Sequence, residues 1–254
     1  MSFYAFCRVT DDLADDLELP IEEKRAGLAK WKAVFDESEV DPELPLQDLQ
    51  GEVLAVRDRY EIPSEYFTNV IEGCQMDLVP QRFERWEDLQ KYTYRVASSV
   101  GLVCLPLFGA DPERAHDYAI ALGDALQLTN ILRDIGEDLD NGSRVYVPLD
   151  DLARFDYSEE ELLGRVHDAR FLEFMNYQAQ RCEELYDKAR SLLPQEDYKA
   201  LLGGDCGGSG DPRVFFAAVS DSDRIDAASA EWNYRHPDAS GGELGKTIYW
   251  KACD

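Results

Sequence analysis

Two pairs of aspartates have a spacing that places each pair on one face of a helix. Asp11 and Asp15 are four residues apart, and so are Asp134 and Asp138. Side chains at this spacing are neighbours on a helix surface, so the two carboxylates of a pair point the same way. Carboxylate oxygens suit Mg²⁺, which bridges to phosphate. Acid pairs at this spacing also arise by chance in an acidic chain, so the rest of each helix must decide.

The second pair belongs to a segment that is apolar around most of its circumference. Over residues 119–138 the polar side chains Gln127, Asn130, Asp134 and Asp138 step by three, four and four, which makes one stripe. A polar stripe on a buried helix must face groups that satisfy it. Inward-facing carboxylates repel each other, which favours a cation between them. We therefore expect a metal-lined cavity rather than a structural hydrogen-bond network.

Two arginines and a tyrosine extend this hypothesis. Arg8 lies on the stripe of the first aspartate pair, and Arg133 adjoins Asp134. Either guanidinium can bind phosphate oxygens with two hydrogen bonds. No Gly-rich phosphate loop is present, so we expect phosphate to be held through metal. Tyr92 begins the segment 92–101, whose small residues suit close packing, and an aromatic face can stabilise a carbocation. Ordinary helix packing explains this segment equally well.

The elements that must position these residues read as helices almost throughout. Apolar periodicity with Pro, Gly and Asp boundaries predicts helices over 1–17, 21–38, 46–60, 86–108, 111–139 and 167–193, one beginning at Pro63, and short ones after Pro148 and at Ser158, where a capping box is expected. No strand pattern is evident, so the fold class is all-α. Residues 203–254 hold 8 of the 17 glycines and lose the helical periodicity. We expect this tail to be poorly ordered.

Composition limits the partners. The chain has 254 residues with 52 acidic and 26 basic side chains, a net charge of −26. Such a balance excludes generic nucleic-acid binding and charge-driven docking on anionic lipid. The six cysteines are scattered, which is typical of reduced thiols in the cytoplasm, and no secretory signal or membrane-spanning stretch is apparent. We expect a cytoplasmic protein.

At this point the motifs resemble those of a known family. The segments 4–8 with 11–16, 92–101, and 127–138 continuing into 144–148 are similar to those of the squalene/phytoene synthases, which are head-to-head prenyl transferases. The resemblance covers about residues 1–202. It implies an all-α isoprenoid synthase helical bundle around a central cavity, without the family's usual first helix, followed by a divergent tail over 203–254.

The resemblance also implies a role for each matched residue. Asp11, Asp15, Asp134 and Asp138 would bind Mg²⁺ and diphosphate, and Arg8 would bind diphosphate. Gln127 and Asn130 would face the substrates. Tyr92 would serve the carbocation rearrangement, and Tyr146 would lie near the diphosphate. With Arg133, these are the predicted site residues.

The implied reaction joins two farnesyl or geranylgeranyl diphosphates through a cyclopropylcarbinyl diphosphate. Squalene would require NADPH as reductant, whereas phytoene forms by proton loss. Asp77 and the run 96–101 favour the bacterial squalene branch slightly, with phytoene synthase as the alternative. Because either product is insoluble in water, we expect peripheral membrane contact.

Three other functions remain as alternatives. Another Mg²⁺-dependent prenyl transferase or terpene synthase would use the same chemistry, but favours denser aspartate motifs or an Asn-Ser-Glu type motif. A di-iron bundle needs two Glu-x-x-His motifs, and the chain has only Glu113–His116. A catalytically inactive relative serving as a scaffold would be expected to have lost its aspartates, and all four are present.

Overall fold

The computed structural model describes residues 2–201, 231–233 and 249–251, and helices dominate them. In chain order the elements are α1 (Ser2–Asp15), α2 (Ile21–Glu37), α3 (Gln47–Arg59), α4 (Ser64–Met76), α5 (Trp86–Thr93), the π-helical turn η1 (Tyr94–Ser98), α6 (Ser99–Leu107), α7 (His116–Asp140), α8 (Leu149–Arg154), α9 (Glu159–Leu163), α10 (Ala169–Leu192), the 3₁₀ turn η2 (Gln195–Asp197), α11 (Tyr198–Leu201), β1 (Glu231–Asn233) and β2 (Tyr249–Lys251).

Most helix boundaries agree with the prediction. Pro20 and Pro63 directly precede α2 and α4, where a residue without an N–H costs nothing. The capping box is confirmed: Ser158 accepts from the Glu161 backbone, and the Glu161 side chain accepts from the Ser158 backbone. It begins the short helix α9.

Two predicted helices differ from the structure. The helix expected over 86–108 is divided by η1, where the hydrogen-bond pattern widens for one turn. The helix expected over 111–139 begins only at His116; before it, the Asp111 side chain accepts from the backbone N–H groups of Glu113 and Arg114 at 3.0 Å each. Those bonds close a separate turn before α7.

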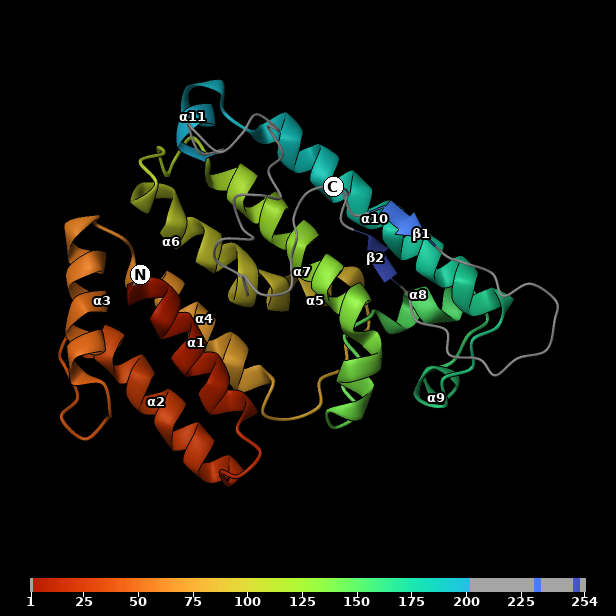
Figure 1. Ribbon diagram of the computed structural model, residues 1–254, viewed down its shortest axis with the longest axis horizontal. Coiled ribbons are helices and arrows are strands. Elements are labelled where there is room, and N and C mark those ends of the chain that lie inside the picture. The colour runs from red at the N-terminus through yellow and green to blue at the C-terminus, as the bar shows by residue number, and fades with distance from the viewer. Residues whose placement is uncertain (1, 202–230, 234–248, 252–254) are drawn as a thin grey trace.

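Helix α7 lies between two packed groups of helices (Figure 1). On one side it packs against α6 and η1, beyond which lie α4, α1, α2 and α3; on the other side α10 runs along it. The first hydrophobic cluster joins side chains of α1 to α4 and α6, among them Trp31 and Phe67. It also includes Leu122, which belongs to α7. The second includes Leu128 of α7 and Phe174 of α10. Because α7 contributes to both clusters, its remaining polar stripe is held rigidly.

The tail contributes one pair of short strands among the described residues. β1 and β2 pair antiparallel, with Trp232 opposite Trp250. No strand was predicted there. Apart from these two strands, the predicted poorly ordered tail of 203–254 lies outside the described residues.

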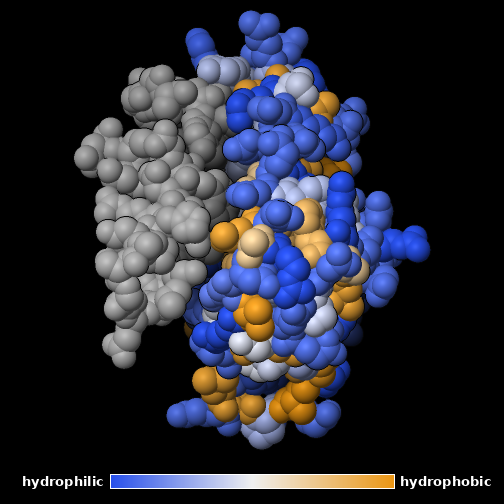
Figure 2. Space-filling view, turned by 90° about the vertical axis from the view of Figure 1, so that its right-hand side faces the viewer, coloured by the Kyte–Doolittle hydropathy of each residue, from blue (hydrophilic) through white to orange (hydrophobic). Residues whose placement is uncertain are grey.

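The described surface is largely hydrophilic, with scattered apolar side chains, on the face that Figure 2 shows. This agrees with the strongly acidic composition. Among the described helices, none is both long and apolar enough to cross a membrane.

Candidate active site

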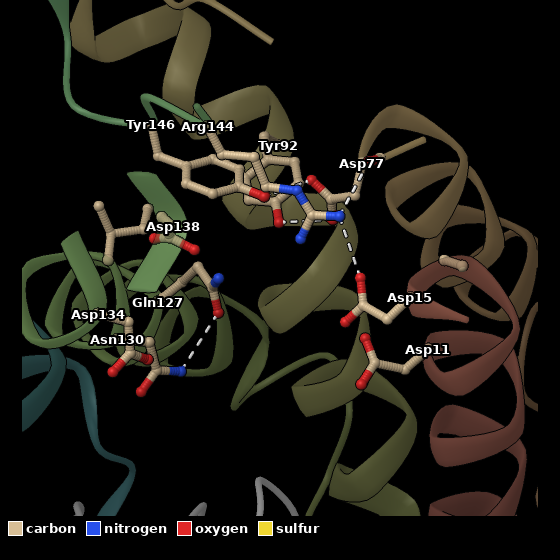
Figure 3. Close-up of a pocket in the computed structure, with 12 residues that line it drawn as sticks. Asp11, Asp15, Asp77, Tyr92, Gln127, Asn130, Asp134, Asp138, Arg144 and Tyr146 are labelled. Carbon is tan, nitrogen blue, oxygen red and sulfur yellow. Dashed lines mark hydrogen bonds and ion pairs between the residues drawn. The ribbon is translucent and has the colours of Figure 1, made fainter. Parts of the chain in front are cut away.

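The two aspartate pairs face each other across one cavity. Asp11 and Asp15 reach it from α1, and Asp134 and Asp138 from α7 (Figure 3). The cavity has a volume of about 150 Å³. Segment 144–146, which follows α7, closes part of its rim. Two helices that are far apart in the sequence, α1 and α7, thus supply the carboxylates of one cavity. The resemblance implied a central cavity of this kind.

The cavity is strongly negative. Five aspartates and a single guanidinium, that of Arg144, are among the residues that line it. Burial and the neighbouring charge of Asp15 raise the pKa of Asp11 to about 6, although the Asp11 side chain stays 58% exposed to the open cavity. Burial and the charge of Asp134 raise the pKa of Asp138 to about 7. In each case these effects outweigh a nearby guanidinium, that of Arg8 for Asp11 and that of Arg144 for Asp138.

The donor set fits a hard divalent cation. The lining offers carboxylate oxygens from both pairs together with the amide oxygens of Gln127 and Asn130, and no thiol or imidazole. Such a set suits Mg²⁺. Within the described part of the chain, no three acidic, His or Cys side chains lie close enough to hold an ion alone. Water or a bound phosphate group would have to supply the remaining oxygen ligands of an ion here.

Asp77 joins two tyrosines at the inner wall. The Tyr92 hydroxyl donates to Asp77 Oδ2 at 2.8 Å, and the Tyr146 hydroxyl donates to Oδ1 at 2.7 Å. The two rings stack with centroids 5.2 Å apart, and Phe83 lies 5.7 Å from Tyr92. Burial and the negative charge of Asp77 raise the pKa of Tyr92 well above its ordinary value. Tyr92 is therefore a neutral hydrogen-bond donor at neutral pH and not a base.

Arg144 ties this wall to the first aspartate helix. Its Nη2 donates to Asp15 Oδ1 at 3.1 Å and to the Asp77 carbonyl oxygen at 3.3 Å (Figure 3). The following residues are anchored as well, because the backbone N–H of Leu149 donates to the Phe83 carbonyl at 2.9 Å. Arg144 and Tyr146 are thus fixed relative to both aspartate pairs.

A larger cavity of about 270 Å³ adjoins the acidic one and shares Asp11, Asp77, Tyr92, Gln127 and Asn130 with it. The remaining wall is mostly apolar. Its members come from α1, α4, η1, α6 and α7: Tyr4, Cys7, Arg8, Val70, Cys74, Val96, Ala97, Val100 and Leu126. The two cavities together offer a charged end and a hydrocarbon end.

The structure gathers most of the predicted site residues. The acidic cavity is lined by Asp11, Asp15, Tyr92, Gln127, Asn130, Asp134, Asp138 and Tyr146. Arg8 lines the adjoining cavity, where it is 45% exposed and contacts Asp12 at 2.8 Å.

Arg133 is the exception. It is not among the residues lining either cavity, and its guanidinium makes two hydrogen bonds of 2.7 and 2.6 Å to Asp134. That contact orients one carboxylate of the second pair. Its role in binding phosphate stays a prediction.

Sequence reasoning missed Asp77 and Arg144 as site residues. Both line the acidic cavity, yet neither belongs to a periodic pattern of polar residues. Asp77 directly follows α4, and Arg144 lies in the connection between α7 and α8. The signals in the sequence were that Arg144 stands within the segment 144–148, which carries the resemblance, and that Asp77 favours the squalene branch.

Comparisons with known proteins show the family to which the chain belongs. The sequence model of the squalene/phytoene synthase family matches residues 1–204. The chain belongs to this family. It is 37% identical over 216 residues to a 15-cis-phytoene synthase of Synechococcus elongatus, covering 78% of this chain and 67% of that protein. It is also 37% identical over 195 residues to the chloroplastic phytoene synthase 1 of Arabidopsis thaliana, covering 74% of this chain and 45% of that protein.

Solved structures of family relatives share the helical fold. Squalene synthase HpnC from Alicyclobacillus acidocaldarius superposes with a TM-score of 0.64 at 30% identity, over 75% of this chain and 70% of that one. A dehydrosqualene synthase in complex with ligand gives a TM-score of 0.62 at 31% identity, over 79% and 69%. The predicted all-α isoprenoid synthase fold is confirmed. The chain spans about half to two thirds of the curated relatives it matches.

Proposed function

We propose that this chain joins two prenyl diphosphates head to head. The observation that carries the proposal is the pairing of a negative cavity, with two aspartate pairs opposed across it, and an apolar cavity that shares its wall. A prenyl diphosphate has the same division into a charged group and a hydrocarbon chain. The phytoene synthases and squalene-type synthases to which the chain is similar support this substrate class.

The aspartate pairs would hold Mg²⁺. The ion would offset the charge of the diphosphate and make it a leaving group. This chain's own contribution is to present four carboxylates from two rigid helices, with Arg133 orienting Asp134. Arg8 stands beside the first pair and is exposed enough to exchange Asp12 for a phosphate oxygen.

The aromatic wall would serve the organic step. Loss of one diphosphate leaves a carbocation at C1 of the first prenyl chain, which the double bond of the second attacks. Loss of a proton then gives the cyclopropylcarbinyl diphosphate. The stacked faces of Tyr92 and Tyr146 can stabilise the positive charge. A second ionisation and rearrangement gives the hydrocarbon.

For the product, the curated relatives named phytoene synthase favour geranylgeranyl diphosphate as substrate and phytoene, formed by proton loss. Squalene from farnesyl diphosphate, with NADPH as reductant, is the second candidate. It is favoured by the structural similarity to a squalene synthase and by Asp77 with the run 96–101. In either case the water-insoluble product would leave through contact with a membrane surface.

One experiment tests the reaction and the product together. The purified full chain is incubated with Mg²⁺ and either farnesyl or geranylgeranyl diphosphate, with and without NADPH, and released diphosphate and extracted hydrocarbons are measured. Release of diphosphate with a chromatographically identified head-to-head product is the expected result. A folded protein that releases none from either substrate would contradict the proposal.

A further inference from the structure

A buried carboxyl on α7 lies outside both cavities. Asp124 is 3% exposed and is not among the residues lining either cavity. It accepts a hydrogen bond from the Thr93 hydroxyl at 2.5 Å and another from Gln90 Nε2 at 2.8 Å. Burying a carboxyl group costs free energy unless the group is well hydrogen-bonded. The two donors therefore show which segment of the chain Asp124 binds. Both partners belong to the last two turns of α5.

Thr93 is the residue at which α5 changes into the π-helical turn η1. In this turn the Tyr94 carbonyl accepts from the backbone N–H of Ser99, five residues later, and also from the Ser99 hydroxyl at 2.9 Å. A π-helical turn winds more residues into one turn than an α-helix, so it changes the direction in which the side chains on either side of it point. Such turns are rare and are often found at functional sites.

Two glycines let the neighbouring helices approach this turn closely. A Cβ atom on Gly123 of α7 would lie 2.7 Å from the backbone N and Cα of Ser98. A Cβ atom on Gly73 of α4 would lie 2.4 Å from Val96 Cγ1. The turn is therefore held between α4 and α7, and Gly123 and Asp124 are adjacent residues that contact its end and its beginning.

The turn connects the two functional ends of the cavities. Tyr92, one residue before Thr93, donates to Asp77 in the acidic cavity. Val96 and Ala97, inside the turn, line the apolar cavity. A change in where the turn begins would move Tyr92 and Val96 together.

We infer that Asp124 is a positioning residue: by binding Thr93 it fixes where the π-helical turn begins, and so places Tyr92 against Asp77 and Val96 in the apolar wall. The inference rests on the proposed function for its kinetic consequence, but its structural content does not. It assigns Asp124 no contact with substrate.

Thr93→Val is the direct test, because valine keeps the shape of threonine and removes the hydroxyl. We expect kcat for hydrocarbon formation to fall about tenfold, since displacing a site group by about 1 Å can cost up to roughly 100-fold. The affinity for Mg²⁺ with pyrophosphate, measured by calorimetry, should stay within about twofold, because neither aspartate pair moves. Thr93→Ser, which keeps the hydroxyl, should restore kcat.

A second pair of variants tests the close packing of the π-helical turn against α7. Gly123→Ala should reproduce the kcat loss, because its methyl group meets the backbone of Ser98. Gly51→Ala on α3 is the matched control, because a Cβ there meets nothing within 4 Å. If Thr93→Val does not fold, Asp124→Asn takes its place, and we expect the same fall in kcat for that variant.

The outcomes separate this inference from the proposed function. A wild-type chain that makes no product contradicts the function. The inference then depends on the crystal structure of Thr93→Val, in which we expect the bond from the Ser99 N–H to the Tyr94 carbonyl to be lost. An active wild-type with an equally active, folded Thr93→Val would overturn the inference, and so would a Thr93→Val structure that keeps the turn.

Discussion

Single residues in the acidic cavity carry charge that the ion-free protein compensates poorly. The pKa values of Asp11 and Asp138 are raised to about 6 and about 7 from the ordinary 3.8, first by burial and then by a neighbouring aspartate. Each carboxyl binds its proton more tightly in the folded than in the unfolded chain. Their contribution to stability is therefore complete below about pH 3.8 and is lost as the pH rises through 6 to 7.

The first prediction follows from this loss of stability with rising pH. Between pH 5.5 and 8 the melting temperature of ion-free wild-type should fall relative to that of Asp138→Asn, which has no carboxyl to titrate there. Mg²⁺ should raise the wild-type melting temperature more at pH 8 than at pH 5.5. Differential scanning calorimetry of both proteins in buffers with Mg²⁺ or EDTA measures this, and equal pH slopes would contradict it.

The second prediction concerns the other aspartate of α7. Asp134→Asn keeps the shape of the side chain but removes charge from the cavity. Diphosphate release should fall by at least roughly 100-fold, the scale typical of losing one group that stabilises developing charge. The circular dichroism spectrum and unfolding midpoint should change little. Full diphosphate release by this variant would show that the reaction takes place at a different site.

Residue types and spacing predicted that the members of each aspartate pair share one helix face, and that Gln127 and Asn130 share the face of the second pair, because all of them lie on regular helical stripes. Spacing does not predict Asp77, because its role depends on two tyrosines, 15 and 69 residues later, that converge on one carboxylate. Convergence of this kind is a property of the packed fold. Arg144 was not predicted for the same reason, because its partner Asp15 lies 129 residues earlier in the sequence.

The third prediction tests that convergence. Asp77→Leu leaves two buried hydroxyls, those of Tyr92 and Tyr146, without their acceptor. The free energy of unfolding should drop by about 2 kcal/mol, the typical penalty of unsatisfied buried polar groups. Urea denaturation measures the loss. Adding Tyr92→Phe and Tyr146→Phe to the variant should recover part of it, and no recovery would show that the carboxylate acts otherwise.

Among the elements, the long helices were predictable because apolar periodicity and terminal residues agree along each of them. The π-helical turn was not. Residues 94–98 have no composition that distinguishes them from an α-helix; the turn arises where Gly73 and Gly123 bring neighbouring helices close and Asp124 holds Thr93. Tertiary packing here overrides the local preference for a continuous helix.

The fourth prediction concerns the attachment of α8 to α10. Asp151 is 6% exposed and pairs with Arg181, which also stacks 4.9 Å from the Trp86 ring. Arg181→Met leaves a buried carboxylate with only Gln178 as a donor at 2.9 Å. We expect a loss of about 3 kcal/mol in the free energy of unfolding. The double variant Asp151→Leu/Arg181→Met should be more stable than Arg181→Met in denaturant titrations, and the opposite order would contradict the argument.

For the whole molecule, the net charge of −26 acts on stability as well as on the choice of partners. Repulsion among like charges opposes the compact state, and salt screens it. The surface shown in Figure 2 is mostly hydrophilic, so much of this charge is solvated. The cytoplasmic location stays a prediction.

The fifth prediction is a rise in melting temperature with salt. The screening length falls from about 10 Å at 0.1 M to about 3 Å at 1 M, so most of the gain should come below roughly 1 M KCl. Melting curves from 0.05 to 3 M KCl, at constant pH, measure it. A gain that is linear over the whole range would instead indicate a general salting effect and not screening.

The two thiols in the apolar cavity bear on the durability of the enzyme. Cys7 and Cys74 line the space proposed for the prenyl chains, and burial raises the pKa of both thiols well above the ordinary value. The thiolate is the nucleophilic form of cysteine, and a protonated thiol is a weaker nucleophile. The same burial that makes the wall apolar thus keeps both thiols protonated, which would lower their reactivity toward the carbocation of the proposed reaction.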